Sequence, residues 1–82
     1  MILVDIYVPS VDQEYDFHLD QNAPIELVIE ELVELISQKE RCKLTGSASE
    51  MMLCNRVKES ILPANYTLAQ CGISSGSKLI LV

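Results

Sequence analysis

Two neighbouring stretches near the start of the chain alternate between apolar and polar side chains, and this alternation limits the fold more than any other feature. A period of two residues is typical of a strand with one buried face. The apolar members are Ile2, Val4, Ile6 and Val8 in the first stretch and Tyr15, Phe17 and Leu19 in the second. Only residues 10–14 separate the two stretches, so they predict an antiparallel hairpin whose loop is longer than two residues.

The segment after the hairpin has the period of an amphipathic helix. It begins at Asn22-Ala23-Pro24, where proline is pre-set for a first helical turn. One broad face is aliphatic and comprises Ile25, Val28, Ile29, Leu32, Val33, Leu35 and Ile36. Glutamates cover the other side, with Leu27 among them, and we expect the helix to fade between Lys39 and Lys43.

The second half of the chain predicts shorter elements. After a polar loop at residues 44–50, the apolar segments Met51–Cys54, Ile61–Leu62 and Lys78–Val82 predict three strands. Between the last two strands, Thr67–Gly72 predicts one helical turn with an N-cap threonine and a glycine stop. Residues 1–82 thus predict one α+β domain in the order β-β-α-β-β-short helix-β, with the main helix packed across one face of a mixed sheet.

Composition narrows the class of protein. Of the 82 residues, 49% are hydrophobic, which supports a core, but no apolar run is long enough for membrane insertion. The net charge of −6, with most acidic residues in the first half, disfavours nucleic acid as a partner. The three cysteines have neither a disulfide nor a metal-site spacing, and the N-terminus lacks the pattern of a signal peptide. We therefore expect a cytoplasmic protein with reduced thiols.

The residue types that most often act in catalysis or bind metal ions do not form a recognisable motif in this sequence. His18 lies on the polar side of an alternating strand without a partner that would make it a base, so we interpret it as a surface residue. We expect Cys71 to be a packed thiol, and nothing near Cys54 would lower its pKa. The hairpin acids fit a solvated face better than a calcium loop; they are Glu14, Asp16 and Asp20. The sequence thus predicts no enzyme, no cofactor and no metal site.

The stretch from Thr67 to Leu79 resembles the segment that joins the last strands of ubiquitin-like proteins. Its pattern is Thr-Leu-x-x-Cys-x-Ile-x-x-Gly-x-x-Leu, in which Leu68 and Ile73 fill the bottom of the core. The resemblance implies a ubiquitin-like β-grasp fold, in which the last strand lies between the first and third strands. Leu79 and Leu81 would then point into the core.

Among ubiquitin-like families, the chain is similar to the YukD/EsaB family. The similarity rests on Leu-x-x-Cys-Gly-Ile-x-x-Gly-x-x-Leu-x-Leu near the end and on the helix start Pro24–Ile29. Members of this family are small cytosolic accessory proteins of the type VII, WXG-substrate secretion systems of Gram-positive bacteria. Related systems carry the same kind of domain at the front of a membrane-embedded component. The resemblance implies a non-catalytic adaptor with a secretion-machine component as its protein partner.

A covalent role would need a Gly-Gly tail, which is absent before Val82. If the chain is complete, we expect neither conjugation nor sulfur transfer. Two alternatives stay open: a modifier or sulfur carrier whose tail is missing from this sequence, and an N-terminal regulatory domain of a larger membrane component.

Docking is the remaining use of such a fold, and the last strand indicates where it occurs. If Leu79 and Leu81 point inward, Ile80 and Val82 point outward. Leu3, and either Leu53 or a neighbouring methionine, would share that outer face. The candidate partner-binding residues are therefore Leu3, Leu53, Ile80 and Val82, on a surface that also suits a homodimer. The glutamate face of the helix around Leu27 is a second candidate, although a solvated surface explains it more simply.

Overall fold

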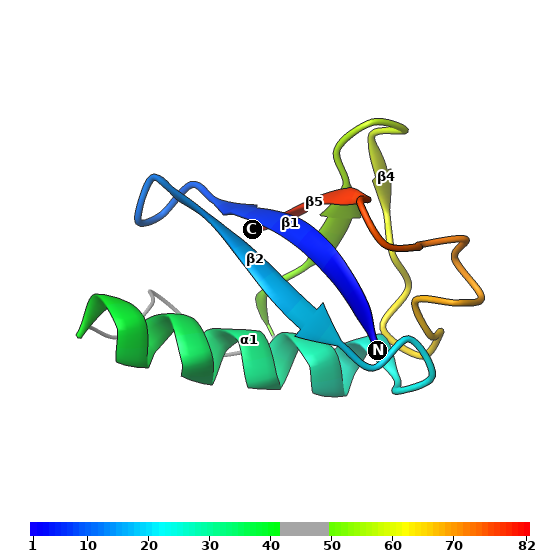
Figure 1. Cartoon of the computed structure of the whole chain (residues 1–82), viewed down its shortest axis with the longest axis horizontal. Coiled ribbons are helices and arrows are strands. Elements are labelled where there is room, and N and C mark those ends of the chain that lie inside the picture. Colours follow the sequence, from blue (N-terminus) through cyan, green and yellow to red (C-terminus); the bar gives the residue numbers. More distant parts are fainter. Residues whose placement is uncertain (42–49) are drawn as a thin grey trace.

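The computed structural model of this chain describes residues 1–41 and 50–82, and it has the predicted α+β architecture. The elements are β1 (Ile2–Val8), β2 (Gln13–Leu19), α1 (Ile25–Glu40), β3 (Leu53–Asn55), β4 (Ser60–Ile61) and β5 (Lys78–Leu81). The helix lies across one face of the sheet (Figure 1). Of the loop predicted at residues 44–50, all but the last residue lies outside the described residues.

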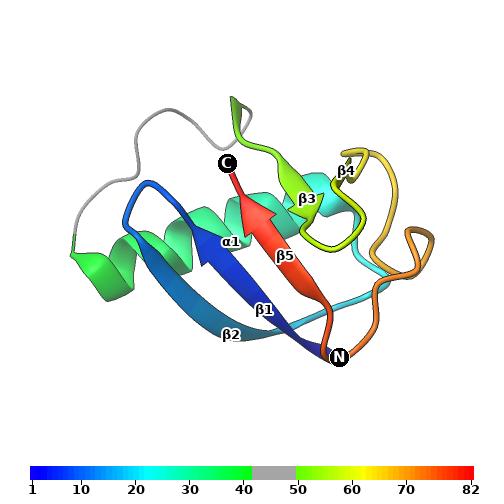
Figure 2. The ribbon, with the colours of Figure 1, turned by 90° about the horizontal axis from the view of Figure 1, so that it is seen from above.

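The sheet has the order β2-β1-β5-β3-β4 and is mixed. The last strand, β5, runs parallel to β1 and antiparallel to β3. It therefore occupies the centre of the sheet (Figure 2), as predicted for the end of the chain. The two edges are different: β2 has seven residues and β4 has two.

The predicted hairpin is confirmed, and β2 begins two residues earlier than the alternation alone suggested. The register of β1 and β2 runs from Ile2 opposite Leu19 to Val8 opposite Gln13. The connecting turn places Asp12 at φ 48°. An aspartate tolerates this left-handed conformation better than most residues do. The turn is also tied to β1, because the hydroxyl of Tyr7 donates to Oδ1 of Asp12 over 2.9 Å.

The N-terminus of α1 is held by another part of the chain rather than by a side-chain cap. The backbone amide of Ile25 donates to the carbonyl of Tyr66 over 2.8 Å, and that of Glu26 donates to Ala64 over 3.0 Å. Two of the four amides that a helix start leaves without intrahelical partners are thereby satisfied. These bonds anchor the helix beside the segment that leads into the last strand.

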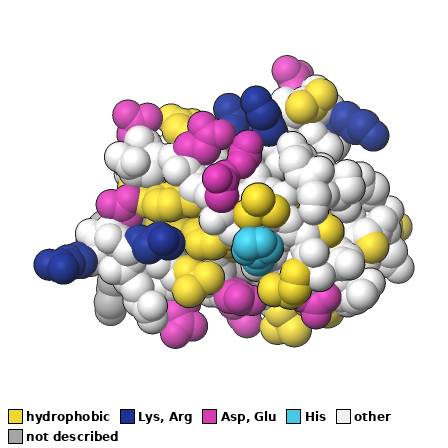
Figure 3. Space-filling view, viewed as in Figure 1, with side chains coloured by type: hydrophobic (Ala, Val, Ile, Leu, Met, Phe, Trp, Pro, Cys, Tyr) yellow, Lys and Arg dark blue, Asp and Glu magenta, His cyan; other side chains and the backbone are white. Residues whose placement is uncertain are grey.

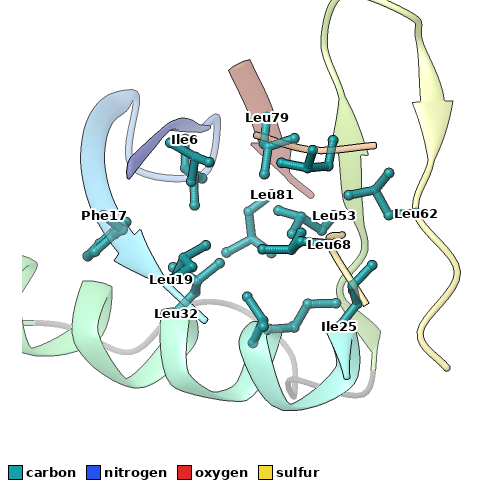
Figure 4. Close-up of a cluster of buried hydrophobic side chains, with 14 of the residues drawn as sticks. Ile6, Phe17, Leu19, Ile25, Leu32, Leu53, Leu62, Leu68, Leu79 and Leu81 are labelled. Carbon is teal, nitrogen blue, oxygen red and sulfur yellow. The ribbon is translucent and has the colours of Figure 1, made fainter. Parts of the chain in front are cut away.

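A single hydrophobic cluster fills the space between the sheet and α1 (Figure 4). The helix contributes Ile25, Val28, Ile29, Leu32 and Ile36, all buried as its period predicts. From β5, Leu79 and Leu81 are 0% and 1% exposed. The inward direction predicted for both leucines is confirmed.

Residues 68–72 form consecutive turns rather than the predicted helical turn, and Thr67 lies in an isolated bridge with Pro24. One helix-like bond is present, from the Cys71 amide to the Thr67 carbonyl, over 3.2 Å. The predicted N-cap contact exists: the Gln70 amide donates to Oγ1 of Thr67 over 3.1 Å, and the Thr67 amide donates to Oε1 of Gln70 over 2.9 Å. Gly72, at φ 75°, ends the segment in the left-handed conformation.

Candidate functional site: the outer face of the sheet

The face of the sheet opposite α1 presents a row of largely apolar side chains across four strands. In register, Tyr7 of β1 lies opposite Ile80 of β5, Ile80 opposite Cys54 of β3, and Cys54 opposite Ile61 of β4. Residues directly opposite each other in neighbouring strands point to the same face, so the four side chains lie side by side. Ile61 is the most accessible of them at 59% exposure, and the other three are partly buried.

Two further apolar side chains continue this row past the end of β5. The backbones of Met52 and Val82 bond to each other in both directions, over 2.6 and 2.9 Å. Their side chains are 45% and 44% exposed. We call the whole set the outer-face patch; it comprises Tyr7, Met52, Cys54, Ile61, Ile80 and Val82. A continuous apolar surface of this kind is more informative than scattered exposed aliphatic residues.

Leu53 was predicted to lie on this face, and that prediction is wrong. Its side chain is fully buried and points toward α1 among the core leucines (Figure 4). The cause is the register, because Leu53 lies opposite the inward Leu81 whereas Cys54 lies opposite the outward Ile80. The neighbouring methionine that faces outward is Met52. A strand of only three residues has too little alternation for its buried side to be recognised from sequence.

Leu3 does lie on the outer face, at 40% exposure, but apart from the patch. It precedes Tyr7 by four residues on β1, which corresponds to about 13 Å along a strand. A charged row lies between them, because Asp5 is opposite Asp16 of β2 on one side and Lys78 of β5 on the other. Of the four predicted residues, the structure thus brings together Ile80 and Val82, separates Leu3 and buries Leu53.

Sequence reasoning missed most of the patch. Tyr7 was not linked to Ile80, and Cys54, Ile61 and Met52 belong to segments without alternation. The available signal for Tyr7 was its position in the alternating β1 run. The pairing that joins β1 to β5 is not visible in the sequence.

An ion pair limits the patch at its β2 end. Nη1 of Arg56 lies 3.1 Å from Oε1 of Glu14, and the guanidinium carbon lies 5.6 Å from the centre of the Tyr7 ring. The Arg56 side chain therefore reaches back over Tyr7 from the turn after β3. The hydrogen bond that Tyr7 donates to Asp12 raises the pKa of the phenol, with burial and the Asp12 charge adding to the shift and Arg56 opposing it.

The charged row contains a pair of like charges. Asp5 and Asp16 face each other across β1 and β2, and a hydrogen bond between their side chains raises the pKa of Asp16, with the negative charge of Asp5 as the next cause. Like charges directly opposite in a sheet are destabilising. Folding therefore makes Asp16 bind its proton more tightly than an ordinary aspartate does.

The histidine, cysteine and acidic side chains that were considered as candidates for catalysis or metal binding do not come together in the structure. His18 is exposed on β2, and Cys71 is partly buried against the core, where burial raises the pKa of its thiol. Glu14 pairs with Arg56, whereas Asp20 accepts a hydrogen bond from the Asn22 amide. Within residues 1–41 and 50–82, no group of three or more His, Cys, Asp and Glu side chains has the arrangement of a metal site.

Comparison with known families decides the relationship. The model of YukD, described as a protein of the WXG100 protein secretion system, matches residues 2–81. The chain belongs to the YukD family. It is a ubiquitin-like type VII secretion accessory domain, as the pattern near the end of the chain and the helix start Pro24–Ile29 implied. No curated protein sequence matches the chain significantly.

Solved structures share the ubiquitin-like β-grasp fold of this YukD-family chain. The EccD5 ubiquitin-like domain from Mycobacterium xenopi is 26% identical with a TM-score of 0.78, over 99% of this chain and 91% of that one. A chain of the MycP5-free ESX-5 inner membrane complex is 20% identical with a TM-score of 0.82; 99% of this chain matches 20% of that chain. The N-terminal ubiquitin-like domain of the 4931431F19Rik protein is 25% identical with a TM-score of 0.71, over 99% and 72% of the two chains. Among the described helices of the present chain, none is long and apolar enough to cross a membrane.

Proposed function

We propose that this chain is a non-catalytic, cytoplasmic adaptor of a WXG100-type secretion system in a Gram-positive bacterium, and that it docks onto a protein component of the machine through the outer-face patch. The observation that carries the proposal is the largely apolar row on the outer face of β1, β5, β3 and β4 in a member of the YukD family. Apolar surface of this kind favours a protein partner, because burying it removes it from water.

The proposed absence of catalysis rests on the chemistry that the described residues offer. His18 has no neighbouring acid–base partner in the site geometry above, and the raised pKa of Cys71 disfavours the thiolate that a nucleophile needs. The outer-face patch instead presents side chains suited to contact. A secretion-machine component is the proposed partner because structural neighbours of the chain come from an ESX-5 membrane complex and an EccD5 protein.

A second candidate is a regulatory domain at the front of a larger membrane component. The EccD5 domain favours it, since nearly the full length of this chain matches that domain. A modifier or sulfur carrier with a Gly-Gly tail is a third. Reading the gene downstream of the codon for Val82 separates the three: a stop codon supports the adaptor, a Gly-Gly codon pair the modifier, and a long apolar extension the membrane component.

The docking proposal is tested by affinity purification of the tagged chain from cells of its source organism. We expect the wild-type chain and the variant Leu27→Glu to recover a component of the secretion machine, and Ile80→Glu to lose it. Leu27 is a matched control, because it is an aliphatic residue with 52% exposure on α1, on the other side of the sheet. The opposite result would assign docking to the glutamate face of α1. Recovery of another copy of the chain alone, abolished by Ile80→Glu, would identify a homodimer instead.

A further inference from the structure

The edge of β2 that faces away from β1 is a second feature that the outer-face patch does not use. β2 pairs with β1 alone, along all seven of its residues. Within residues 1–41 and 50–82, no backbone hydrogen bond from another segment reaches Glu14, Asp16 or His18, whose backbone groups point away from β1. The opposite edge is blunted, because β4 has two residues and is followed closely by Pro63. A full-length edge strand can accept a further strand from another chain.

An apolar strip lies between this edge and α1. On the strand side it is formed by the rings of Tyr15 and Phe17, whose centroids are 5.7 Å apart. On the helix side it contains the partly buried Val33. The Tyr15 hydroxyl donates to Oε1 of Glu40, which fixes the side of α1 that faces β2. Val33 precedes Glu40 by seven residues, or two helical turns, and so lies on that same side.

Acidic side chains border the strip on both sides. Glu14 and Asp16 are exposed on β2, and Glu26 is exposed on α1, about four helical turns before Glu40 and on the same side of the helix. Figure 3 shows hydrophobic side chains in a band between acidic groups above and below it, with basic groups at the left end, where α1 finishes. A second copy of this chain would bring its own acidic β2 against these residues, so self-pairing along this edge is disfavoured.

We propose that the edge of β2 binds an extended segment of a protein partner in which apolar side chains alternate with lysine or arginine. The segment adds to the sheet as a sixth strand. Its apolar side chains cover Val33 and the small exposed part of Phe17, which is 7% exposed, and its basic side chains lie beside Asp16 and Glu14. Main-chain hydrogen bonds hold such a segment, and the side chains on its two faces select it. This inference is independent of the outer-face patch, because it uses a different surface.

The test uses the 82-residue chain and a seven-residue peptide of alternating lysine and valine, followed by nuclear magnetic resonance and amide hydrogen exchange. We expect saturable shifts at residues 13–19 and around Val33, and slower exchange of β2 amides. A control peptide has the same composition in two blocks, with the valines first and the lysines after them. It carries the same charge but cannot alternate, so we expect it to leave the exchange of β2 amides unchanged.

Two charge-reversal variants complete the design. Asp16→Lys should weaken binding of the alternating peptide about threefold to tenfold, because one favourable cross-strand pair becomes a repulsive one. It should not impair folding, since it also relieves the repulsion from Asp5. Glu31→Lys makes the same charge change nine residues before Glu40, on the opposite side of α1, and should have little effect. Equal binding of both peptides, unchanged exchange in β2, or shifts confined to the outer-face patch would overturn the proposal.

Discussion

Ile80 of β5 lies directly opposite Cys54 of β3, at the centre of the sheet. On its other side it lies opposite Tyr7 of β1, so it is the middle member of the apolar row. The next residue toward the N-terminus, Leu79, is fully buried. One short strand therefore supplies both the core of the domain and the centre of its candidate docking surface.

The two faces of β5 should respond differently to substitution. Because the Leu79 side chain is fully buried, Leu79→Ala should lower the free energy of unfolding by about 2–5 kcal/mol. Ile80→Glu should change it by about 1 kcal/mol or less, since a glutamate on the outer face stays in contact with water. Urea unfolding followed by circular dichroism measures both values. The reverse order of the two effects would mean that the faces are exchanged.

The burial of Leu53 leads to a similar comparison on β3. Leu53→Ala should destabilise the chain by about 2–5 kcal/mol, because it leaves a cavity beside Leu81. Met52→Ala, one residue earlier and 45% exposed, should cost about 1 kcal/mol or less. If thermal and urea unfolding showed Met52 to be the costlier site, the register of β3 against β5 would be wrong.

Sequence alone predicted those elements in which the alternation or helical period assigns each side chain to the buried or the exposed face. The alternation of β1 and β2 and the helical period from Ile25 to Ile36 determine their buried faces without tertiary information. The Thr67–Leu79 pattern then placed the last strand through its resemblance to ubiquitin-like proteins. These parts comprise the core and account for the outward direction of Ile80.

The rest depends on contacts between distant segments, which the pattern of residues does not specify. Leu53 could not be assigned a face in a three-residue strand. Leu3 was grouped with Ile80 because both point outward, but only the register shows that Asp5 and Lys78 lie between them. Thr67 makes the predicted cap, yet its segment is too short to continue as a helix.

The Asp5–Asp16 pair should make stability depend on pH. The folded chain binds the Asp16 proton more tightly than the unfolded chain does, because the pKa of Asp16 is raised above its ordinary value of 3.8. The repulsion is complete above the raised pKa and disappears below the unfolded value. Asp16→Asn should therefore stabilise the chain near neutral pH, and this gain should shrink as the pH falls through the carboxylate range.

Unfolding experiments at a series of pH values measure this gain. Glu31→Gln removes the same charge from an exposed position on α1 and serves as the control. An Asp16→Asn gain that is constant from neutral to strongly acidic pH, or equal to that of Glu31→Gln throughout, would contradict the role assigned to the aspartate pair.

The reciprocal contact between Thr67 and Gln70 should contribute measurably to stability. Thr67→Ala removes the oxygen that accepts from the Gln70 amide and should cost about 0.5–2 kcal/mol. Gln70→Ala removes the acceptor for the Thr67 amide, and the double variant should cost less than the sum of the two. Strict additivity in urea unfolding would show that the two bonds do not act as a unit.

Export of WXG100 substrates from the source organism tests the central claim most directly. Cells lacking the gene would be complemented with the wild-type chain, Ile80→Glu or Leu27→Glu, at matched protein levels. The account predicts that the wild-type chain and Leu27→Glu restore export, whereas Ile80→Glu, at the centre of the outer-face patch, does not. Full restoration of export by Ile80→Glu would contradict docking through this face.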